Sequence, residues 1–284
     1  FARSTREFFS LRRSFAASRR RTLASMLRRG VIFVRHGETE WNRALRVQGS
    51  TDIPLNEKGR AQAQACASDL LSDLFSGRNS YAAVMIYSSP LARALDTATT
   101  IARTLSPVQN KDISVSTTNA LKEWNLGVLE GLTKDEASVE YPEDWRIFSQ
   151  WANPCVPTDD SNTPLTDGES MEQVRCRAAD FVNTIVNSID NDAGEKEIAG
   201  DHVVIICVTH GGVMGQLLRH VAETTGRLNH ENVNKRPANA SISKFTIERN
   251  GTAVEPQWEI KLWADTDHLT GDLAPASANY HKTS

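Results

Sequence analysis

The chain has 284 residues, of which 39% are hydrophobic and 24% are charged, as in ordinary globular proteins. This composition excludes a disordered chain, a collagen-like chain and a small disulfide scaffold. No apolar run approaches the roughly 18 residues that a membrane helix needs, so we expect no membrane span.

The charge is divided unevenly along the chain. Residues 1–30 hold nine Arg and one acid, a net charge of +8, so the rest carries −11 of the total of −3. An arm rich in Arg and Ser and nearly free of acids is typical of a transit peptide, and it predicts import into a mitochondrion or plastid. The alternative is a cytoplasmic protein that starts at Met26. The acidic body argues against a nucleic-acid partner, because phosphate binding needs a basic face.

Strands and helices are expected to alternate along the body. The apolar runs predict strands over 31–34, 82–87, 113–116, 203–208, 240–247 and 258–263. Helices are expected over 57–75 after an Asn56 cap, from Ser89-Pro90 to about 105, over 169–189 and over 211–221. The polar stretch 133–167, with four Pro and the spaced aromatic residues Trp145, Phe148 and Trp151, is expected to form an inserted helical lid.

These elements predict an α/β fold with three α/β/α layers, a central mostly parallel sheet and the inserted lid. The expected domain spans 31–270, between the basic arm of residues 1–30 and a tail over 271–284. The four cysteines form no C-x-x-C pair and lack the His neighbours of a zinc site, so we expect no metal site and a reducing, intracellular setting.

Three short motifs place phosphate-binding chemistry at strand ends. Arg35-His36-Gly37 follows the first strand, where open α/β sheets place their ligands. Arg93 lies in the first turn of the helix after Ser88-Ser89-Pro90. His210-Gly211-Gly212 follows the strand 203–208, and glycines at a helix start expose N–H groups to an anion. Two His and two Arg at these places point to a bound phosphoryl group.

The same residues carry a family resemblance. R-H-G-E-T-E-W-N at 35–42, S-S-P-L-A-R-A at 88–94, L-K-E-W-N-L-G-V-L-E-G at 121–131 and T-H-G-G at 209–212 resemble the histidine phosphatase superfamily, in its phosphoglycerate-mutase-like branch. The motifs stand in family order and span about 31–270. The resemblance implies a phosphatase of carbohydrate metabolism that works through a phosphohistidine and takes no cofactor or metal.

The resemblance also implies a role for each residue. His36 would be the nucleophile, and Glu123 would protonate the leaving oxygen and then activate water. The phosphoryl oxygens would be held by Arg35, Arg93 and His210, with Asn42, Gln48, Gly49 and Gly211 completing the pocket. Glu38 and Glu130 are expected to be structural, although Glu130 could compete for the acid role. Asp167 to Ser170 are expected to cap the long helix.

Three functions stay open from the sequence. The first is a phosphatase acting on a small phosphorylated metabolite, the second a phosphoglycerate mutase, and the third a protein-directed phosphatase or binding relative. In the mutases of the resemblance an Arg follows the acid Glu and a pair of Arg lies in the lid. Here Trp124 follows Glu123, and Lys134 and Arg146 are the basic residues between Gly131 and Ser170. This difference favours hydrolysis and an acceptor that either is less charged or has an apolar face. A homo-oligomer is compatible with the sequence.

Overall fold

The computed structural model describes residues 27–75, 81, 83–150, 160–193, 203–225, 235–249 and 256–275. Most of the predicted arm, Cys155 and the end of the chain lie outside these residues, so the import prediction stays a prediction. Within the described residues, none of the helices is both long and apolar enough to cross a membrane.

A six-stranded sheet forms the middle of the domain, with the strand order β3-β2-β4-β1-β5-β6. The strands β1, β2, β4 and β3 pair in parallel, whereas β5 and β6 extend the sheet in antiparallel fashion. This confirms the mostly parallel sheet. The strands are β1 (Leu27–Arg35), β2 (Ala83–Ser88), β3 (Val115–Thr117), β4 (Val203–Thr209), β5 (Ile242–Arg249) and β6 (Gln257–Asp265).

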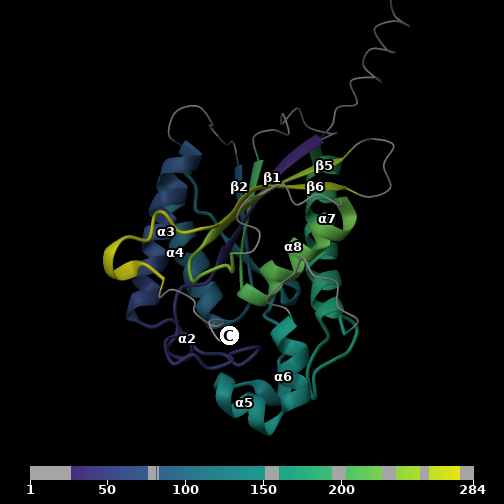
Figure 1. The fold of residues 1–284 in the computed structure, drawn as a ribbon. Coiled ribbons are helices and arrows are strands. Elements are labelled where there is room, and N and C mark those ends of the chain that lie inside the picture. Colours follow the sequence, from purple (N-terminus) through teal and green to yellow (C-terminus); the bar gives the residue numbers. More distant parts are fainter. Residues whose placement is uncertain are drawn as a thin grey trace, which may run out of the picture.

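Helices cover both faces of the sheet, as expected for three layers (Figure 1). The helices α3 (Glu57–Phe75) and α4 (Ala92–Gln109) pack on one face, and α7 (Met171–Ala193) and α8 (Gly211–Thr225) pack on the other. Alternate residues of β1 face the two cores: Ile32 and Val34 contact the α3–α4 side, while Val31 and Phe33 contact the α7–α8 side. Every residue of β4 is buried, because β4 lies in the middle of the sheet with helices over both of its faces.

The strand register brings the predicted motifs together. The neighbouring parallel strands β1 and β4 place Arg35 opposite Thr209 at their carboxyl ends. The residues that follow, His36 and His210, therefore leave the sheet side by side. The strand β2 pairs with β4 on its other side and ends at Ser88, so the third motif reaches the same edge.

The insertion at 133–167 carries two short helices, α5 (Lys134–Glu140) and α6 (Pro142–Ser149), with residues 151–159 outside the described range. Both lie at the end of the molecule where α2 (Glu40–Arg43) is found (Figure 1). Two glycines hold the insertion to the rest of the domain. A Cβ on Gly127, whose φ is +52°, would lie 1.9 Å from Thr166 O, and one on Gly168 would lie 2.6 Å from Asn125 O. The backbones of 125–127 and 166–168 are therefore in direct contact.

Several boundaries differ from the sequence expectations. β1 begins at Leu27, inside the predicted arm, because its pairing with β5 continues to Arg249. The helix α4 begins at Ala92, not at Pro90, and Ser89 does not cap it. Its N-terminal Ala92 N–H donates instead to Asp52 Oδ1 at 2.8 Å. The predicted tail begins with a 3-10 helix, η5 (Gly271–Leu273), which contacts α3.

Candidate active site

His36 is buried at the carboxyl end of β1, with 2% of its surface exposed. Its Nδ1 lies 2.7 Å from Gly37 O, and a carbonyl oxygen can only accept, so Nδ1 carries the proton and Nε2 keeps its lone pair. Burial, and then the charges of Arg93 and Arg35, hold the pKa of His36 well below its ordinary value. The imidazole is therefore neutral at physiological pH and presents a nucleophilic nitrogen.

His210 stands beside His36, with ring centroids 5.0 Å apart. Its Nε2 lies 2.8 Å from Ser89 Oγ, which also accepts from Leu91 N. Burial, Arg93 and His36 lower the pKa of His210 well below its ordinary value. Its Nδ1 is buried and makes no hydrogen bond with any described residue. The Ser89 hydroxyl can donate to Nε2, and in that tautomer the neutral ring carries its proton on Nδ1 as a donor available to a ligand.

Arg93 supplies a buried permanent charge. Its Nη1 and Nη2 donate to Thr51 O and Gly49 O at 2.8 and 2.7 Å, and its buried Nε bonds to no described residue. Burial lowers the pKa of Arg93 to about 10, against the opposing effect of the Glu123 and Asp52 carboxylates. The group therefore stays cationic at neutral pH, with a buried donor left for a ligand.

Arg35 is the second guanidinium of the site. It is half-buried, and its Nη1 donates to Pro237 O at 2.8 Å. A Cβ on Gly211 would lie 3.4 Å from Arg35 Nε, so this guanidinium lies against the N-terminus of α8. Positive charge and helix N–H groups thus meet at one place, which favours an anion.

Glu123 lies at the same helix start. Its carboxylate accepts from Gly212 N at 3.1 Å and from Trp124 N at 2.9 Å. A Cβ on Gly212 would lie 2.5 Å from Glu123 Oε1, so the glycine is needed for the acid to come this close. The start of α8 therefore brings three predicted site residues together. Arg35 lies against Gly211, His210 directly precedes that glycine, and Glu123 accepts from Gly212 N.

The Glu130 carboxylate holds the loop at 48–51 in place. Glu130 accepts hydrogen bonds from Leu126 N and from the backbone N–H and hydroxyl groups of Ser50 and Thr51. Gly49 has φ of +55°, and a Cβ there would lie 2.2 Å from Glu130 Oε1. All of these partners are donors, and those from Ser50 and Thr51 order the loop, which agrees with the structural role expected of Glu130. Glu38 is structural as well, accepting from Asn56 Nδ2.

The remaining predicted pocket residues form a polar group beside His36. Asn42 Oδ1 accepts from Asn239 Nδ2 at 3.0 Å, and Asn239 Nδ2 also lies within hydrogen-bond distance of the His36 and Gly37 carbonyls. Gln48 is buried, and its Oε1 accepts from Thr39 Oγ1 at 2.7 Å. Asn42 and Gln48 thus lie in the network that fixes the loop after His36, while Gly49 orients Arg93 through its carbonyl.

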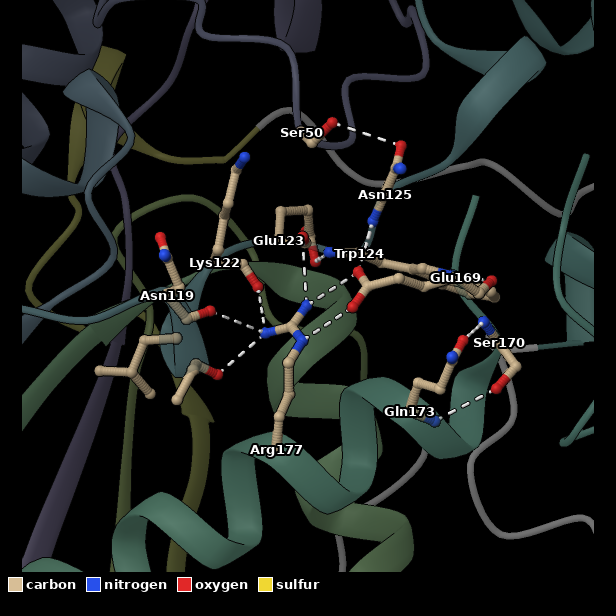
Figure 2. A network of polar contacts seen from close by, with 12 residues as sticks. Ser50, Asn119, Lys122, Glu123, Trp124, Asn125, Glu169, Ser170, Gln173 and Arg177 are labelled. Atoms are coloured by element: carbon tan, nitrogen blue, oxygen red, sulfur yellow. Dashed lines mark hydrogen bonds and ion pairs between the residues drawn. The ribbon is translucent and has the colours of Figure 1, made fainter. Parts of the chain in front are cut away.

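Trp124 departs from the expectation that it suits an apolar acceptor. Only 1% of its surface is exposed, its indole N–H donates to Glu169 O, and its ring packs 5.8 Å from that of Phe148. The side chain therefore joins the insertion to the core. In the Asp167–Ser170 segment, Ser170 caps α7 reciprocally with Gln173, as expected of a capping device, whereas the Glu169 carboxylate pairs with Arg177 (Figure 2).

Four residues of the site region have no role in the site assigned from the sequence. Ser89 lies within one of the motifs, but its hydrogen bond with His210 is not predicted by that motif. Asn239 has no motif around it. Arg177 and Glu169 act on the Glu123 loop from α7 and the segment before it (Figure 2). Among the described residues, no group of three or more His, Cys, Asp or Glu is arranged to hold a metal ion.

The comparisons with known proteins agree with this geometry. Residues 31–264 match the histidine phosphatase superfamily (branch 1). The phosphoglycerate mutase-like protein 4 of Arabidopsis thaliana is 30% identical over 243 residues, covering 84% of this chain and 86% of the relative. A metal-independent phosphoserine phosphatase of the same plant is 32% identical over 242 residues, covering 84% and 83%. The solved structure of a mycobacterial glucosyl-3-phosphoglycerate phosphatase superposes with a TM-score of 0.63 at 27% identity, covering 84% of this chain and all of that one.

The buried neutral histidines predict a pH-dependent stability. The unfolded chain binds protons near the ordinary His pKa of about 6.5, whereas the folded site excludes them from His36, so the free energy of unfolding falls as the pH drops below about 6.5. We expect His36→Gln to reduce this slope by up to about 1.4 kcal/mol per pH unit, the effect of one proton. Urea unfolding at several pH values between about 7 and 5 measures both slopes. An unchanged slope in the variant would contradict a neutral buried His36.

Proposed function

From the premise that this chain belongs to the histidine phosphatase superfamily, we propose that it is a metal-independent phosphomonoesterase that works through phosphorylated His36. The observation that carries the proposal is the neutral His36 ring. Its Nδ1–H donates to Gly37 O, its Nε2 lone pair is available, and the charges of Arg35 and Arg93 both act on it. A nucleophile needs this lone pair, and a phosphate dianion needs this charge to approach it.

The first step forms a bond from His36 Nε2 to phosphorus and breaks the ester P–O bond. Arg35, Arg93 and His210 Nδ1–H stabilise the charge on the phosphoryl oxygens, because these donors are fixed before the reaction begins. The leaving oxygen receives a proton from the Glu123 carboxyl group, which stands at the Gly212 N–H. This proton prevents the departure of a costly alkoxide.

The second step reverses the proton transfer. The Glu123 carboxylate takes a proton from water, the water oxygen bonds to phosphorus, and the N–P bond to His36 breaks. Inorganic phosphate leaves and His36 is again neutral with its proton on Nδ1. One carboxyl group thus serves as acid and then as base, as covalent catalysis in two steps requires.

Arg35 and Arg93 stand where a metal ion acts in many phosphoryl-transfer enzymes. Mg²⁺ neutralises phosphoryl charge in those sites, and two permanent guanidinium charges supply the same stabilisation here. The name of the metal-independent phosphoserine phosphatase relative supports this proposal. Activity in assays with excess chelator tests it, and a loss that added Mg²⁺ restores would contradict it.

The substrate class that we propose is a small phosphorylated metabolite, with the insertion over 133–167 acting as a lid that selects it. The relatives support this class, since their names specify phosphoserine and glucosyl-3-phosphoglycerate as substrates. Lys122 projects on the same side of its loop as Glu123 (Figure 2), which offers one ammonium group to an acidic leaving group. Phosphate release from a panel of phosphorylated sugars, hydroxy acids and phosphoserine would identify the preferred substrate.

The nucleophile assignment predicts that His36→Ala lowers the turnover rate by roughly 10³-fold or more, as loss of the nucleophile does in other enzymes. The variant should also trap no labelled phosphate after a denaturing quench in alkali, where the N–P bond of a phosphohistidine survives, because alanine offers no nitrogen to phosphorylate. The matched control is Cys66→Ala, a buried substitution in α3 outside the site, which should keep both properties. Labelled phosphate bound to the His36→Ala chain would refute the assignment.

The acid assignment predicts that Glu123→Gln slows hydrolysis of a poor leaving group, such as the serine of phosphoserine, by roughly 10² to 10⁴. Nitrophenyl phosphate should lose far less, since nitrophenolate leaves with little protonation. Steady-state rates with both substrates give the comparison. Equal losses would mean that Glu123 is only structural.

A mutase is the second candidate, favoured by the names of several relatives. A mutase must hold a carboxylate and a second phosphate with positive charge beyond the phosphoryl clamp. In the lid, the Arg146 guanidinium is already bound to the carboxylates of Glu143 and Asp160. This pairing neutralises it and supports hydrolysis over transfer to a second acid substrate.

With 3-phosphoglycerate and a bisphosphoglycerate primer, we therefore expect inorganic phosphate to form faster than 2-phosphoglycerate. Product analysis by ³¹P NMR would follow both compounds in one sample. Faster formation of 2-phosphoglycerate would replace the phosphatase assignment with the mutase assignment.

A further inference from the structure

Arg177 lies in the second turn of α7, and its guanidinium reaches the loop that carries Glu123. The loop before Glu123 is a short 3-10 helix, η1 (Asn119–Leu121), whose final carbonyl groups find no partners within the helix. Arg177 Nη1 donates to Lys122 O at 2.7 Å and Ala120 O at 2.9 Å, and Nη2 reaches Glu123 O at 3.2 Å. The remaining carbonyl, Leu121 O, accepts from Thr209 Oγ1 at 2.7 Å.

Glu169 holds the other side of the same loop. Its carboxylate pairs with Arg177 at 3.0 Å and accepts from Asn125 N at 2.9 Å. Its backbone carbonyl accepts from the Trp124 indole at 2.7 Å. The residues before Glu123 are thus bound by Arg177 and the residues after it by Glu169, with the ion pair joining the two (Figure 2).

We propose that Arg177 and Glu169 form a clamp that positions Glu123 for proton transfer, and this proposal rests on the acid role of Glu123 proposed above. Arg177 touches no reacting atom, so it is a positioning residue. Only a guanidinium has a planar set of donors that can bond several carbonyls and a carboxylate at once. The clamp also reaches the phosphate side of the site, because Asn125 Oδ1 accepts from Ser50 Oγ at 3.4 Å.

The clamp has a kinetic signature that a general loss of structure lacks. A displaced Glu123 fails to protonate a poor leaving group but leaves the His36 attack and the Arg charges in place. Because a misplacement of about 1 Å can cost about 10² in rate, we expect Arg177→Gln to lower kcat for phosphoserine by about 10 to 10². Nitrophenyl phosphate, which needs little protonation, should lose less than about threefold.

A double-mutant cycle with Glu123→Gln separates positioning from folding. If Arg177 acts through Glu123, adding Arg177→Gln to the Glu123→Gln variant should cost less than about threefold with phosphoserine, because the two effects are not additive. A purely structural Arg177 would lower the rate of the Glu123→Gln variant as much as that of the unmodified enzyme. Either that result or an equal loss with both substrates would overturn the proposal.

The chain offers a matched control on the same helix. Arg175 also pairs with a carboxylate, that of Glu172, and 19% of its side-chain surface is exposed against 21% for Arg177. Arg175→Gln should leave the ratio of the two substrates' rates unchanged. Arg177→Lys serves if Arg177→Gln fails to fold, since it keeps the charge beside Glu169 but lacks the planar fork of donors that reaches the carbonyls and the carboxylate together. It should show the same substrate bias to a smaller degree, and an unbiased loss would again reject the clamp.

The two proposals fail in different ways. A Glu123→Gln variant that loses rate equally with both substrates would reject the acid role and with it the basis of the clamp. A Glu123→Gln variant with the expected bias, alongside an Arg177→Gln variant without it, would reject the clamp and leave the phosphatase mechanism intact.

Discussion

The site depends on bringing permanent positive charge to one edge of a sheet. The two guanidiniums nearest His36 donate to backbone carbonyls: Arg93 to Gly49 O and Thr51 O, and Arg35 to Pro237 O. A carbonyl dipole orients a guanidinium but carries no net charge, so these hydrogen bonds leave the charge of each cation in place. Elsewhere, Arg146, Arg175 and Arg177 pair with carboxylates. These three arginines hold structure through ion pairs, to which Arg177 adds hydrogen bonds to backbone carbonyls.

The same charge sets the state of the two histidines. Both histidines are buried near Arg35 and Arg93. Protonated imidazoles would add further positive charge there, whereas neutral rings avoid this repulsion. The division is useful for phosphoryl transfer: arginine supplies charge that does not titrate, and histidine supplies a lone pair that the charge keeps free of protons. Each property would be weaker if one residue type had to provide both.

The sequence predicts the parts of this site that are local and misses the parts that depend on distant contacts. His36, His210 and Arg93 follow directly from strand ends and short motifs, and the central strand 203–208 follows from its unbroken apolar run. Asn239 lies some 200 residues from the His36 carbonyl that it reaches, and nothing in its neighbourhood marks it. The sequence predicts too early a start for α4, because Ser89 fits the local rules for a cap. The actual acceptor, Asp52, lies 40 residues earlier in the chain, where local rules do not look.

Trp124 shows a further limit of pattern reasoning. An aromatic residue beside a catalytic acid suggests contact with substrate, but burial is set by what packs on it, here Phe148 and the Glu169 carbonyl. In the mutase pattern an arginine follows the acid. Here Trp124 occupies that position, and it attaches the insertion to the core.

The backbone contact between Gly127 and Gly168 has a consequence for how such enzymes diversify. No side chain fits at either position, so the two ends of the insertion are docked at a fixed distance from the acid loop. The segment between them can then change in length and composition while its anchorage stays constant. A chimera that exchanges this segment between relatives and keeps both glycines would inherit a new acceptor surface without a new fold, which makes the glycine pair a natural junction for transplanting specificity.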